Sequence, residues 1–449
     1  MALRLSSPGP SSMPVAAIKP PNAPTTTSVA SSDKIGNTTS VRSDFNTDHE
    51  ILPSSQEFLI LCMLTSASPA MYQHDGPMDG RPEQLTAALN GATPIGWWRA
   101  PGRVNLIGDH TDYCEGFVLP MAIDRDCLLA VAEADGGRIR VRSLELDGVV
   151  DLDAAGRDDP RTVEPAWGRF VAGAVQVVNE RGASLPGLDI ALSSTVPAGS
   201  GLSSSSALAV ALTFALAQLG ELKLDRREIA RDALDAEVRA TGVPGGLMDQ
   251  LASLYGEADH ALLIDCRSLD VEAIAIPPDL AVIVVHSGLP RTLADSEYAQ
   301  RRADCERAAG GLGLPTLRDA TFDQVRDDPR ARHVVTENER VLAFARALRD
   351  GSINELGPLL NASHASLRDD FEVSTPELDQ LVHALMEAGA MGARLTGAGF
   401  GGCVVALTAA KRAQRVISDA TERYQGVTRL TPIPFVAHGS EGARHSLAP

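Results

Sequence analysis

A glycine- and serine-rich loop near the middle of this 449-residue chain could bind phosphate. The stretch from Thr195 to Gly220 reads TVPAGSGLSSSSALAVALTFALAQLG, in which Gly199 and Gly201 precede four serines and an Ala/Leu-rich run that predicts a helix. Glycines let a backbone approach a ligand closely, a serine can cap the helix, and the free N–H groups of the first helical turn attract an anion. The same residues also fit an ordinary capped helix that follows a glycine turn.

Three common phosphate-binding signatures do not describe this loop. No lysine follows it, so a Walker A loop is excluded. The glycine spacing is not G-x-G-x-x-G, and no acidic residue occupies the place that a dinucleotide ribose requires. The H-R-D and D-F-G signatures of protein kinases are also missing from the sequence.

A second segment gathers polar and charged side chains that could hold a polyol. Residues 100–123 read APGRVNLIGDHTDYCEGFVLPMAI and contain Arg103, Asp109, His110 and Asp112 between turn glycines. Such side chains can bind sugar hydroxyls through neutral and charge-assisted hydrogen bonds. A solvated charged turn is the alternative, but the apolar residues on both sides of the cluster weaken it.

A third segment, GARLTGAGFGGCVVAL at Gly392–Leu407, combines a glycine-rich loop with a buried strand. A loop with so few side chains usually exists to approach a ligand or another backbone closely. The sequence alone leaves both possibilities open.

These three segments resemble the three conserved motifs of the GHMP small-molecule kinases, in the same order and with similar spacing. Within that superfamily the chain is most similar to the galactokinase family, whose signature normally reads GRVNLIGEHTDY where this chain has GRVNLIGDHTDY. Further similar stretches are GLMDQLASLYGEADHALLIDCRSL (Gly246–Leu269), SEYAQRRADCE (Ser296–Glu306) and SHASLRDDFEVSTPELDQLV (Ser363–Val382). The resemblance extends from about residue 80 to the 430s.

The resemblance implies an α/β (α+β) fold of two domains with the active site in the cleft between them. It also implies an ATP- and Mg²⁺-dependent phosphotransferase that phosphorylates the anomeric hydroxyl of α-D-galactose. By this analogy Asp249 is the general base, beside the anomeric hydroxyl, and Arg103 offsets charge that develops on the transferred phosphoryl group. Without the matching flanks, Asp249 would be an unremarkable aspartate at a helix start.

The other site residues are likewise assigned by analogy with the family. The substrate-binding set is Asp109, His110, Thr111, Asp112, Asp249 and Tyr298. The nucleotide-binding set is Gly199, Ser200, Gly201, Leu202, Ser203, Ser204 and Ser205, with Ser143 and Trp167 from elsewhere. Ser205 and Glu237 match the magnesium ligands of the family, and one hydroxyl with one carboxylate suits an ion that keeps waters and shares phosphate oxygens. Read alone, Glu237 would be a surface acid on a helix.

Asp109 is the one clear departure from the family pattern, since it replaces a glutamate. Its side chain is one methylene shorter, so contact with a sugar hydroxyl would need a backbone shift or a bridging water. The kinase assignment is unaffected, but the preferred sugar becomes less certain. Thr111 favours galactose over N-acetylgalactosamine, and other sugars with an axial fourth hydroxyl remain possible.

Three other functions are less consistent with the sequence. A non-catalytic galactose sensor would resemble this chain, but known sensors have lost residues from the serine-rich loop, whereas GLSSSSAL, Arg103 and Asp249 are intact here. A GHMP kinase acting on mevalonate or homoserine would lack the sugar segment and SEYAQRRADCE. A nucleic-acid-binding module is opposed by the net charge of −18.

Alternating strand-like and helix-like runs would carry these motifs. We expect strands at Leu128–Val131, Arg138–Val141, Leu188–Ser193, Ala281–Val285 and Cys403–Leu407, and helices at Ser204–Leu219 and Arg226–Arg239. The Pro-containing passage before Asp279 predicts a boundary between an N-terminal kinase domain at 75–275 and a C-terminal kinase domain at 276–449.

Residues 1–74 differ in amino-acid composition from the rest of the chain. They are rich in Ser, Thr, Pro and Asn, which indicates a disordered tail or an extension from a misplaced start, with Met71 or Met78 as the first residue. A cleaved organellar targeting segment is the alternative. The apolar run from Phe58 to Ala70 is too short to span a bilayer.

Composition bounds the class of protein. A hydrophobic fraction of 44% can form a sizeable core, and six scattered cysteines without a C-x-x-C pair fit a reducing compartment. These features fit a cytoplasmic protein, and the net charge of −18 disfavours nucleic acid and anionic membranes as partners. The resemblance implies a small-molecule sugar as the partner, and we expect a monomer.

Overall fold

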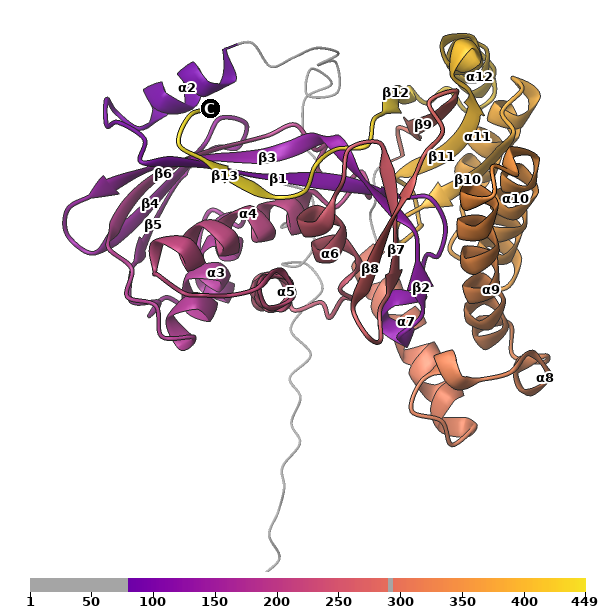
Figure 1. Ribbon diagram of the computed structural model, residues 1–449, viewed down its shortest axis with the longest axis horizontal. Coiled ribbons are helices and arrows are strands. Elements are labelled where there is room, and N and C mark those ends of the chain that lie inside the picture. The colour runs from indigo at the N-terminus through magenta and orange to yellow at the C-terminus, as the bar shows by residue number, and fades with distance from the viewer. Residues whose placement is uncertain (1–79, 290–293) are drawn as a thin grey trace, which may run out of the picture. The chain divides into compact units, whose positions relative to one another are not determined.

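The computed structural model describes residues 80–289 and 294–449 (Figure 1). The predicted tail at residues 1–74, together with Met71 and Met78, lies outside the described residues. Among the helices that are described, none is both long and apolar enough to cross a membrane.

A six-stranded sheet forms the first half of the fold, in the order β13-β1-β3-β6-β4-β5. Its strands are β1 (Gly96–Asn105), β3 (Pro120–Ala134), β4 (Arg138–Ser143), β5 (Val149–Asp153), β6 (Gly187–Ser194) and β13 (Arg444–Ser446). Only β4 and β6 pair in parallel. In β4, Ile139 and Val141 are buried while the arginines between them are less so, as the alternation of a strand requires.

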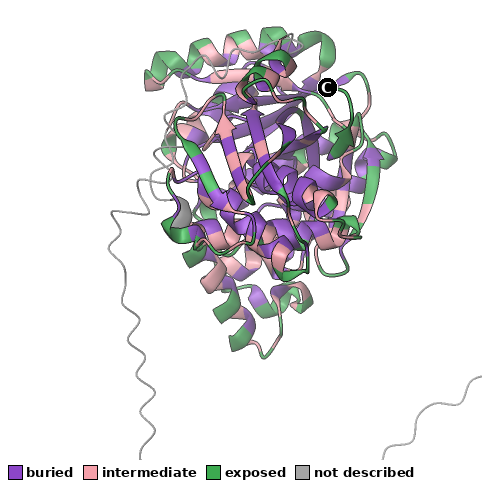
Figure 2. Cartoon of the chain, turned by 90° about the vertical axis from the view of Figure 1, so that its left-hand side faces the viewer, coloured by how far each residue is buried: buried purple, intermediate pink, exposed green. Residues whose placement is uncertain are grey.

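Four helices cover one face of this sheet and a short one covers the other (Figure 1). The four are α3 (Gly168–Glu180), α4 (Ser204–Leu219), α5 (Arg226–Thr241) and α6 (Met248–Tyr255), and α2 (Arg81–Ala88) lies opposite. The helix α4 is apolar around nearly its whole circumference because it packs on β1 and β3 and is itself covered by α3 and α5. Figure 2 shows the resulting buried strands and the exposed outer surfaces of the covering helices.

A four-stranded antiparallel sheet forms the second half, in the order β10-β11-β9-β12. Its strands are β9 (Leu280–His286), β10 (Gly392–Thr396), β11 (Cys403–Ala409) and β12 (Ile433–Ala437). Every residue of β9 is buried because both faces are covered. Val282 and Val284 pack with residues of α9 and α10, whereas Ile283 and Val285 pack with residues of α11 and α12.

Six helices belong to the second half of the fold. They are α7 (Ala294–Gly311), α8 (Phe322–Val325), α9 (Pro329–Arg349), α10 (Ile353–Asp369), α11 (Pro376–Glu387) and α12 (Ala413–Thr428). A three-stranded sheet consists of β2 (Phe117–Val118), β7 (His260–Asp265) and β8 (Asp270–Ala275). Short 3-10 turns are η2 (Asp112–Cys114), η3 (Pro160–Thr162), η4 (Leu317–Asp319) and η5 (Ala410–Arg412).

The predicted α/β fold and its main elements are confirmed. The helix expected at Ser204–Leu219 has those bounds, and the two predicted apolar strands are β9 and β11. The last strand, β13, returns to the first sheet and pairs with β1, so residues on both sides of the predicted boundary at 275 contribute to it. The division into domains at that residue stays a prediction.

Candidate active site

Most of the predicted site residues line a single cavity of about 460 Å³. The sugar segment contributes Arg103, Asp109, His110 and Asp112; the glycine–serine loop contributes Gly199, Gly201, Ser203, Ser204 and Ser205; and Glu237, Asp249 and Tyr298 come from α5, α6 and α7. These segments are far apart in the sequence, and the fold brings them to one place. Gly397 and Ala398 from the third motif also line it.

Arg103 and Asp249 form a bidentate ion pair in this cavity. Arg103 donates from Nε to Asp249 Oδ1 over 2.8 Å and from Nη2 to Oδ2 over 2.9 Å. The arginine side chain is 5% exposed and the aspartate side chain 24%, so the aspartate is the more accessible of the two from the cavity. Asp249 lies in the first turn of α6, where the helix dipole also favours a negative charge. The planar fork of Arg103 therefore fixes the orientation of the carboxylate.

The glycine–serine loop brings backbone N–H groups to the same cavity. Gly199, Gly201 and Ser203 all adopt left-handed backbone conformations, with φ of +67°, +82° and +60°. The loop follows β6 and leads into α4, whose N-terminal turn opens on the cavity. This is the arrangement in which helix N-termini bind phosphate.

Ser203 occupies the N-cap position of α4, but its side chain does not cap the helix. Its hydroxyl donates to Asp249 Oδ2 instead. The expectation of a serine cap is therefore wrong in this detail, because the left-handed backbone of Ser203 differs from the extended conformation that directs an N-cap side chain at the first helical N–H groups. The Ser203 side chain therefore does not accept a hydrogen bond from the first N–H groups of α4.

Ser200 and Leu202 support the loop from its buried side. The Ser200 hydroxyl donates to the Pro197 carbonyl over 2.7 Å. The Leu202 carbonyl accepts from the backbone N–H of Arg103 over 3.1 Å, and the Leu202 side chain is fully buried. Neither residue lines the cavity, so their contribution to it is the shape of the loop.

Glu237 and Ser205, the predicted magnesium ligands, lie together. The Glu237 carboxylate accepts from Ser206 Oγ over 2.9 Å and from Gln250 Nε2 over 2.8 Å, and it also hydrogen-bonds the Ser205 hydroxyl. Burial raises the pKa of Glu237, although the serine hydroxyls oppose the shift. The sequence analysis did not identify Ser206 or Gln250 as site residues. Gln250 could have been noticed, because it is a polar residue directly after Asp249 at the start of a helix.

The sugar segment presents His110 and Asp112 to the cavity, whereas Thr111 points away from it. The His110 ring contacts the Tyr113 hydroxyl over 2.9 Å and the Ala398 carbonyl over 3.2 Å, and burial lowers its pKa well below 6.5, so the ring is neutral. Thr111 is fully buried, and its hydroxyl lies within hydrogen-bonding distance of the Gly108 and Phe117 carbonyls. Its side chain thus stabilises the turn.

Asp112 lies close to Asp249, and the two carboxylates differ in environment. Burial, and then the negative charge of Asp249, raise the pKa of Asp112 to about 7. Asp249 has Arg103 beside it, whereas Asp112 does not share that contact. Near neutral pH a substantial fraction of Asp112 is therefore protonated and able to donate a hydrogen bond.

We expect Asp112→Asn to stabilise the protein at pH 8 but not at pH 5. The folded state holds the Asp112 proton up to about pH 7, whereas the unfolded chain releases it near pH 3.9, so wild-type stability falls as pH rises through this range. The variant does not lose stability in this way, and the difference in the free energy of unfolding amounts to at most about 4 kcal/mol above pH 7. Thermal melts of both proteins at the two pH values test this.

A suitable control for that comparison is Asp323→Asn on α8, whose side chain is 82% exposed. It should change the melting temperature little at either pH. Equal destabilisation of the Asp112 variant at pH 5 and pH 8 would contradict the assignment.

Tyr298 on α7 closes the sugar side of the cavity. Its ring centroid lies 5.6 Å from that of His110 and 5.4 Å from that of Tyr113, and burial raises the pKa of its hydroxyl well above 10. Nearby on α7, Arg302 donates to the Gly245 carbonyl over 3.3 Å. This contact connects α7 to the loop that precedes Asp249.

Ser143 and Trp167 are not among the residues that line the cavity. The Ser143 hydroxyl accepts from the backbone N–H groups of Glu145 and Leu146, and the Trp167 indole donates to the Asp147 carbonyl over 3.0 Å. Phe170, one turn further along α3, does line the cavity. The assignment of Ser143 and Trp167 to nucleotide binding stays a prediction.

Arg394 is a further residue that sequence reasoning missed. It is fully buried in β10 and pairs with Asp109, which is 2% exposed. A charged residue in an otherwise apolar strand was the signal that could have identified it, because charges are rarely buried without a partner.

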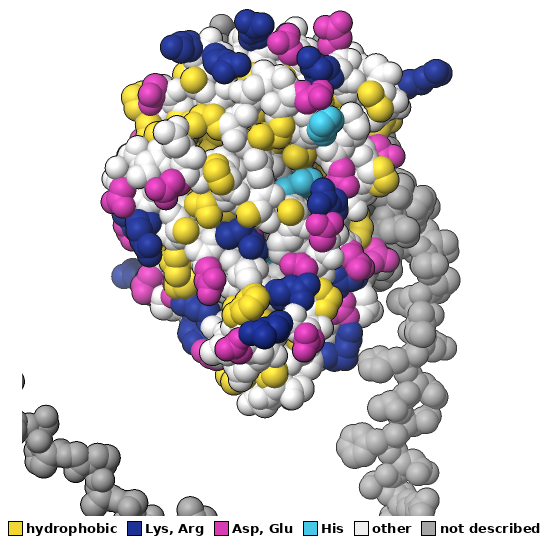
Figure 3. All heavy atoms as spheres, turned by 90° about the vertical axis from the view of Figure 1, so that its right-hand side faces the viewer, with side chains coloured by type: hydrophobic (Ala, Val, Ile, Leu, Met, Phe, Trp, Pro, Cys, Tyr) yellow, Lys and Arg dark blue, Asp and Glu magenta, His cyan; other side chains and the backbone are white. Residues whose placement is uncertain are grey.

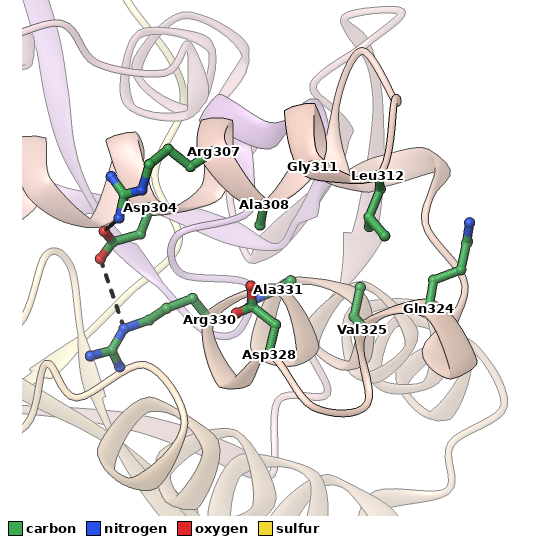
Figure 4. A pocket seen from close by; sticks show the side chains of 10 residues that line it. All are labelled: Asp304, Arg307, Ala308, Gly311, Leu312, Gln324, Val325, Asp328, Arg330 and Ala331. Carbon is green, nitrogen blue, oxygen red and sulfur yellow. Dashed lines mark hydrogen bonds and ion pairs between the residues drawn. The ribbon is translucent and has the colours of Figure 1, made fainter. Parts of the chain in front are cut away.

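A second cavity, of about 580 Å³, lies between α7 and the α8–α9 region (Figure 4). Its charged side chains include Asp304, Arg307 and Arg330, and Asp304 pairs with both arginines. None of the predicted site residues lines this cavity.

Comparison with known protein families and structures agrees with this geometry. The GHMP kinase N-terminal domain matches residues 169–257, the galactokinase galactose-binding signature matches residues 86–133, and the GHMP kinase C-terminal domain matches residues 344–426. The galactokinase of Roseiflexus sp. (strain RS-1) is 44% identical over 359 residues, which cover 77% of this chain and 91% of the relative.

Solved structures give the same result. Lactococcus lactis galactokinase in complex with galactose superimposes with a TM-score of 0.76 at 30% identity, covering 81% of this chain and 98% of that one. Methanococcus jannaschii mevalonate kinase shares the fold, with a TM-score of 0.57 at 18% identity over 78% of this chain and all of that one. On these grounds the chain belongs to the galactokinase family of the GHMP kinases.

Proposed function

We propose that this protein transfers the γ-phosphoryl group of ATP to the anomeric hydroxyl of α-D-galactose, giving ADP and α-D-galactose 1-phosphate. The observation that carries the proposal is the Arg103–Asp249 pair, which lies in one cavity between the sugar segment and the glycine–serine loop. Membership of the galactokinase family supports phosphoryl transfer to a sugar hydroxyl. The galactose-binding signature at residues 86–133 supports galactose as the acceptor.

Asp249 would accept the proton of the anomeric hydroxyl as that oxygen bonds to the γ-phosphorus and the bond from the γ-phosphorus to the ADP oxygen breaks. Its oxygens already accept hydrogen bonds from Arg103 and Ser203. The incoming hydroxyl would therefore compete with the Ser203 hydroxyl, which is free to turn toward a phosphate oxygen. Such a reaction depends mainly on positioning and charge stabilisation and needs no phosphorylated enzyme.

The glycine–serine loop would hold the phosphates of ATP with the N–H groups at the start of α4. Arg103 also donates from Nη1 to the Gly201 carbonyl over 2.6 Å, which ties the catalytic pair to this loop. A change in the loop therefore acts on Asp249 and on the nucleotide together.

Ser205 and Glu237 would hold Mg²⁺, and the residues present fit that ion. In the described part of the chain no cluster of three or more His, Cys, Asp or Glu side chains could bind a metal unaided. A hydroxyl and a carboxylate leave room for waters and phosphate oxygens, as Mg²⁺ prefers. Gln250 Oε1, beside Glu237, is a buried oxygen without a hydrogen-bond partner among the described residues. When bound, the ion would neutralise charge on the phosphates.

On the sugar side, His110, Asp112 and Tyr298 would contact galactose hydroxyls. A partly protonated Asp112 can donate or accept a hydrogen bond, whereas both His110 nitrogens already contact protein groups, so a sugar hydroxyl would replace the Tyr113 hydroxyl or the Ala398 carbonyl there. Asp109 also lines the cavity, and its assignment to substrate binding stays a prediction.

We further propose that the protein acts in the cytoplasm as a monomer without nucleic acid. The face drawn in Figure 3 intersperses basic and acidic side chains instead of grouping the basic ones, and the net charge is −18. Both features disfavour binding to a polyanion.

The proposal is tested by ATP- and Mg²⁺-dependent ADP release with galactose, glucose, N-acetylgalactosamine, arabinose and mevalonate as separate acceptors. We expect galactose to give by far the highest kcat/KM. Preference for another sugar would contradict the assigned acceptor. No release with any acceptor, while galactose still binds, would favour a non-catalytic sensor.

A further inference from the structure

Arg394 links the second sheet to the sugar segment through contacts that are entirely buried. It projects from β10, and its side chain has no solvent exposure. Its Nη1 donates to the Leu106 carbonyl over 3.0 Å, and its Nη2 donates to Asp109 Oδ2. The same guanidinium thus binds the backbone of the sugar segment at Leu106 and the side chain of Asp109, three residues further along it.

Asp109 is held by two other segments besides β10. Its Oδ1 accepts from Asn105 Nδ2 over 3.0 Å and from the backbone N–H of Gly397 over 3.2 Å. Asn105 ends β1 and Gly397 begins the glycine-rich loop. The carboxylate therefore joins β1, β10 and the glycine-rich loop, and its oxygens are directed at protein groups.

The residues next to Asp109 line the sugar side of the cavity. His110 follows it directly and contacts the Ala398 carbonyl, so the glycine-rich loop contacts both Asp109 and His110. Asp112 lies three residues after Asp109. Any shift of Asp109 relative to β10 would move these two side chains, since the intervening turn is short and buried.

We propose that Arg394 is a positioning residue that sets the geometry of galactose binding through Asp109. A buried ion pair contributes little net stability compared with apolar packing, but it fixes the relative position of the segments that it joins. Arg394 holds the sugar segment against β10 and so places His110 and Asp112. The inference rests on the proposed function and gives Asp109 the task of joining the sugar segment to β10.

The test compares Arg394→Gln with Tyr424→Phe. Tyr424 is a suitable control because it is fully buried in the same half of the fold and its hydroxyl donates to the Ser287 carbonyl over 2.9 Å, so the variant loses a buried hydrogen bond that does not involve Asp109 or the groups around it. Galactose Kd by calorimetry, KM values for galactose and ATP, and melting temperatures are measured for wild type and both variants.

Both variants should melt at lower temperature, but only Arg394→Gln should raise the Kd and KM for galactose, by about tenfold or more. Its KM for ATP should change less, because the hydrogen bonds within the glycine–serine loop do not involve Arg394. An unchanged galactose Kd, or an equal rise in both variants, would overturn the proposal. Wild-type protein that is inactive on galactose would instead refute the proposed function.

A double-mutant cycle tests whether Arg394 acts through Asp109. If it does, Asp109→Asn together with Arg394→Gln should raise the galactose Kd no further than the worse single variant. Effects that multiply would overturn the link. If Arg394→Gln fails to fold, Arg394→Lys serves, because an ammonium presents its donors from one nitrogen and lacks the planar fork whose two nitrogens bind Asp109 and the Leu106 carbonyl. An unchanged galactose KM in that variant would also overturn the proposal.

Discussion

Asp249→Asn should lower kcat by about 10³-fold while the protein still folds and binds ATP. An amide has nearly the same size as the carboxylate but cannot accept the proton of the sugar hydroxyl. It also places an N–H₂ group against Arg103 or Ser203, which are themselves donors. Steady-state kinetics with galactose and nucleotide binding by calorimetry measure the two expectations separately.

Asp265→Asn is the matched control for this variant. Asp265 is 25% exposed and is paired with Arg318 over 3.0 Å, much as Asp249 is 24% exposed and paired with Arg103. It does not line the cavity. The control should lose thermal stability and keep kcat, and full activity in folded Asp249→Asn would show that the base lies elsewhere.

Arg103→Met should lower kcat by about 10²–10³-fold, the usual cost of removing one preorganised group that stabilises charge in the transition state. The substitution keeps much of the buried stem but removes three contacts at once. Two go to Asp249 and one goes to the Gly201 carbonyl. Arg103→Lys should recover only part of the loss, because an ammonium cannot bind a carboxylate in a bidentate manner.

Arg318→Met breaks the comparable Asp265 pair outside the cavity and separates loss of stability from loss of catalysis. We expect it to melt earlier and to turn over normally. If the Arg103 and Arg318 variants lost the same small amount of activity, Arg103 would be a structural residue only.

The fold was predictable where the sequence pattern has one physical solution. The apolar run at Ser204–Leu219 follows a glycine loop, and α4 has those bounds because a helix that is apolar all round must be buried between layers. The return of β13 to pair with β1 was not predictable, because a three-residue exposed strand carries no hydrophobic pattern. Only tertiary pairing identifies it.

The site was predictable where long motifs fix the residue types. Asp249, Arg103, His110 and Asp112 line the same cavity, although the sequence separates the first from the others by more than 130 residues. Side-chain direction was less predictable. Ser203 donates to a distant carboxylate instead of capping its helix, and such a choice depends on partners that only the folded chain supplies.

The ion-pair partner of Arg394 also could not be predicted from the sequence. Its strand reads as a buried apolar segment, and nothing local reveals that the partner of the charge is Asp109, 285 residues earlier. The substitution of aspartate for glutamate at position 109 raised a question about sugar contact from sequence alone. The structure shows how the shorter side chain is held: Asn105, Arg394 and the backbone N–H of Gly397 donate hydrogen bonds to its carboxylate.

The most direct test of the account is phosphorus NMR of one reaction containing the wild-type protein, Mg-ATP and α-D-galactose. The account predicts equal amounts of ADP and a single sugar phosphate, with the phosphate on the anomeric oxygen in the α configuration. Phosphate on any other hydroxyl would contradict the position of Asp249 as the base. ATP consumption without a sugar phosphate would contradict the central claim that this cavity transfers phosphate to galactose.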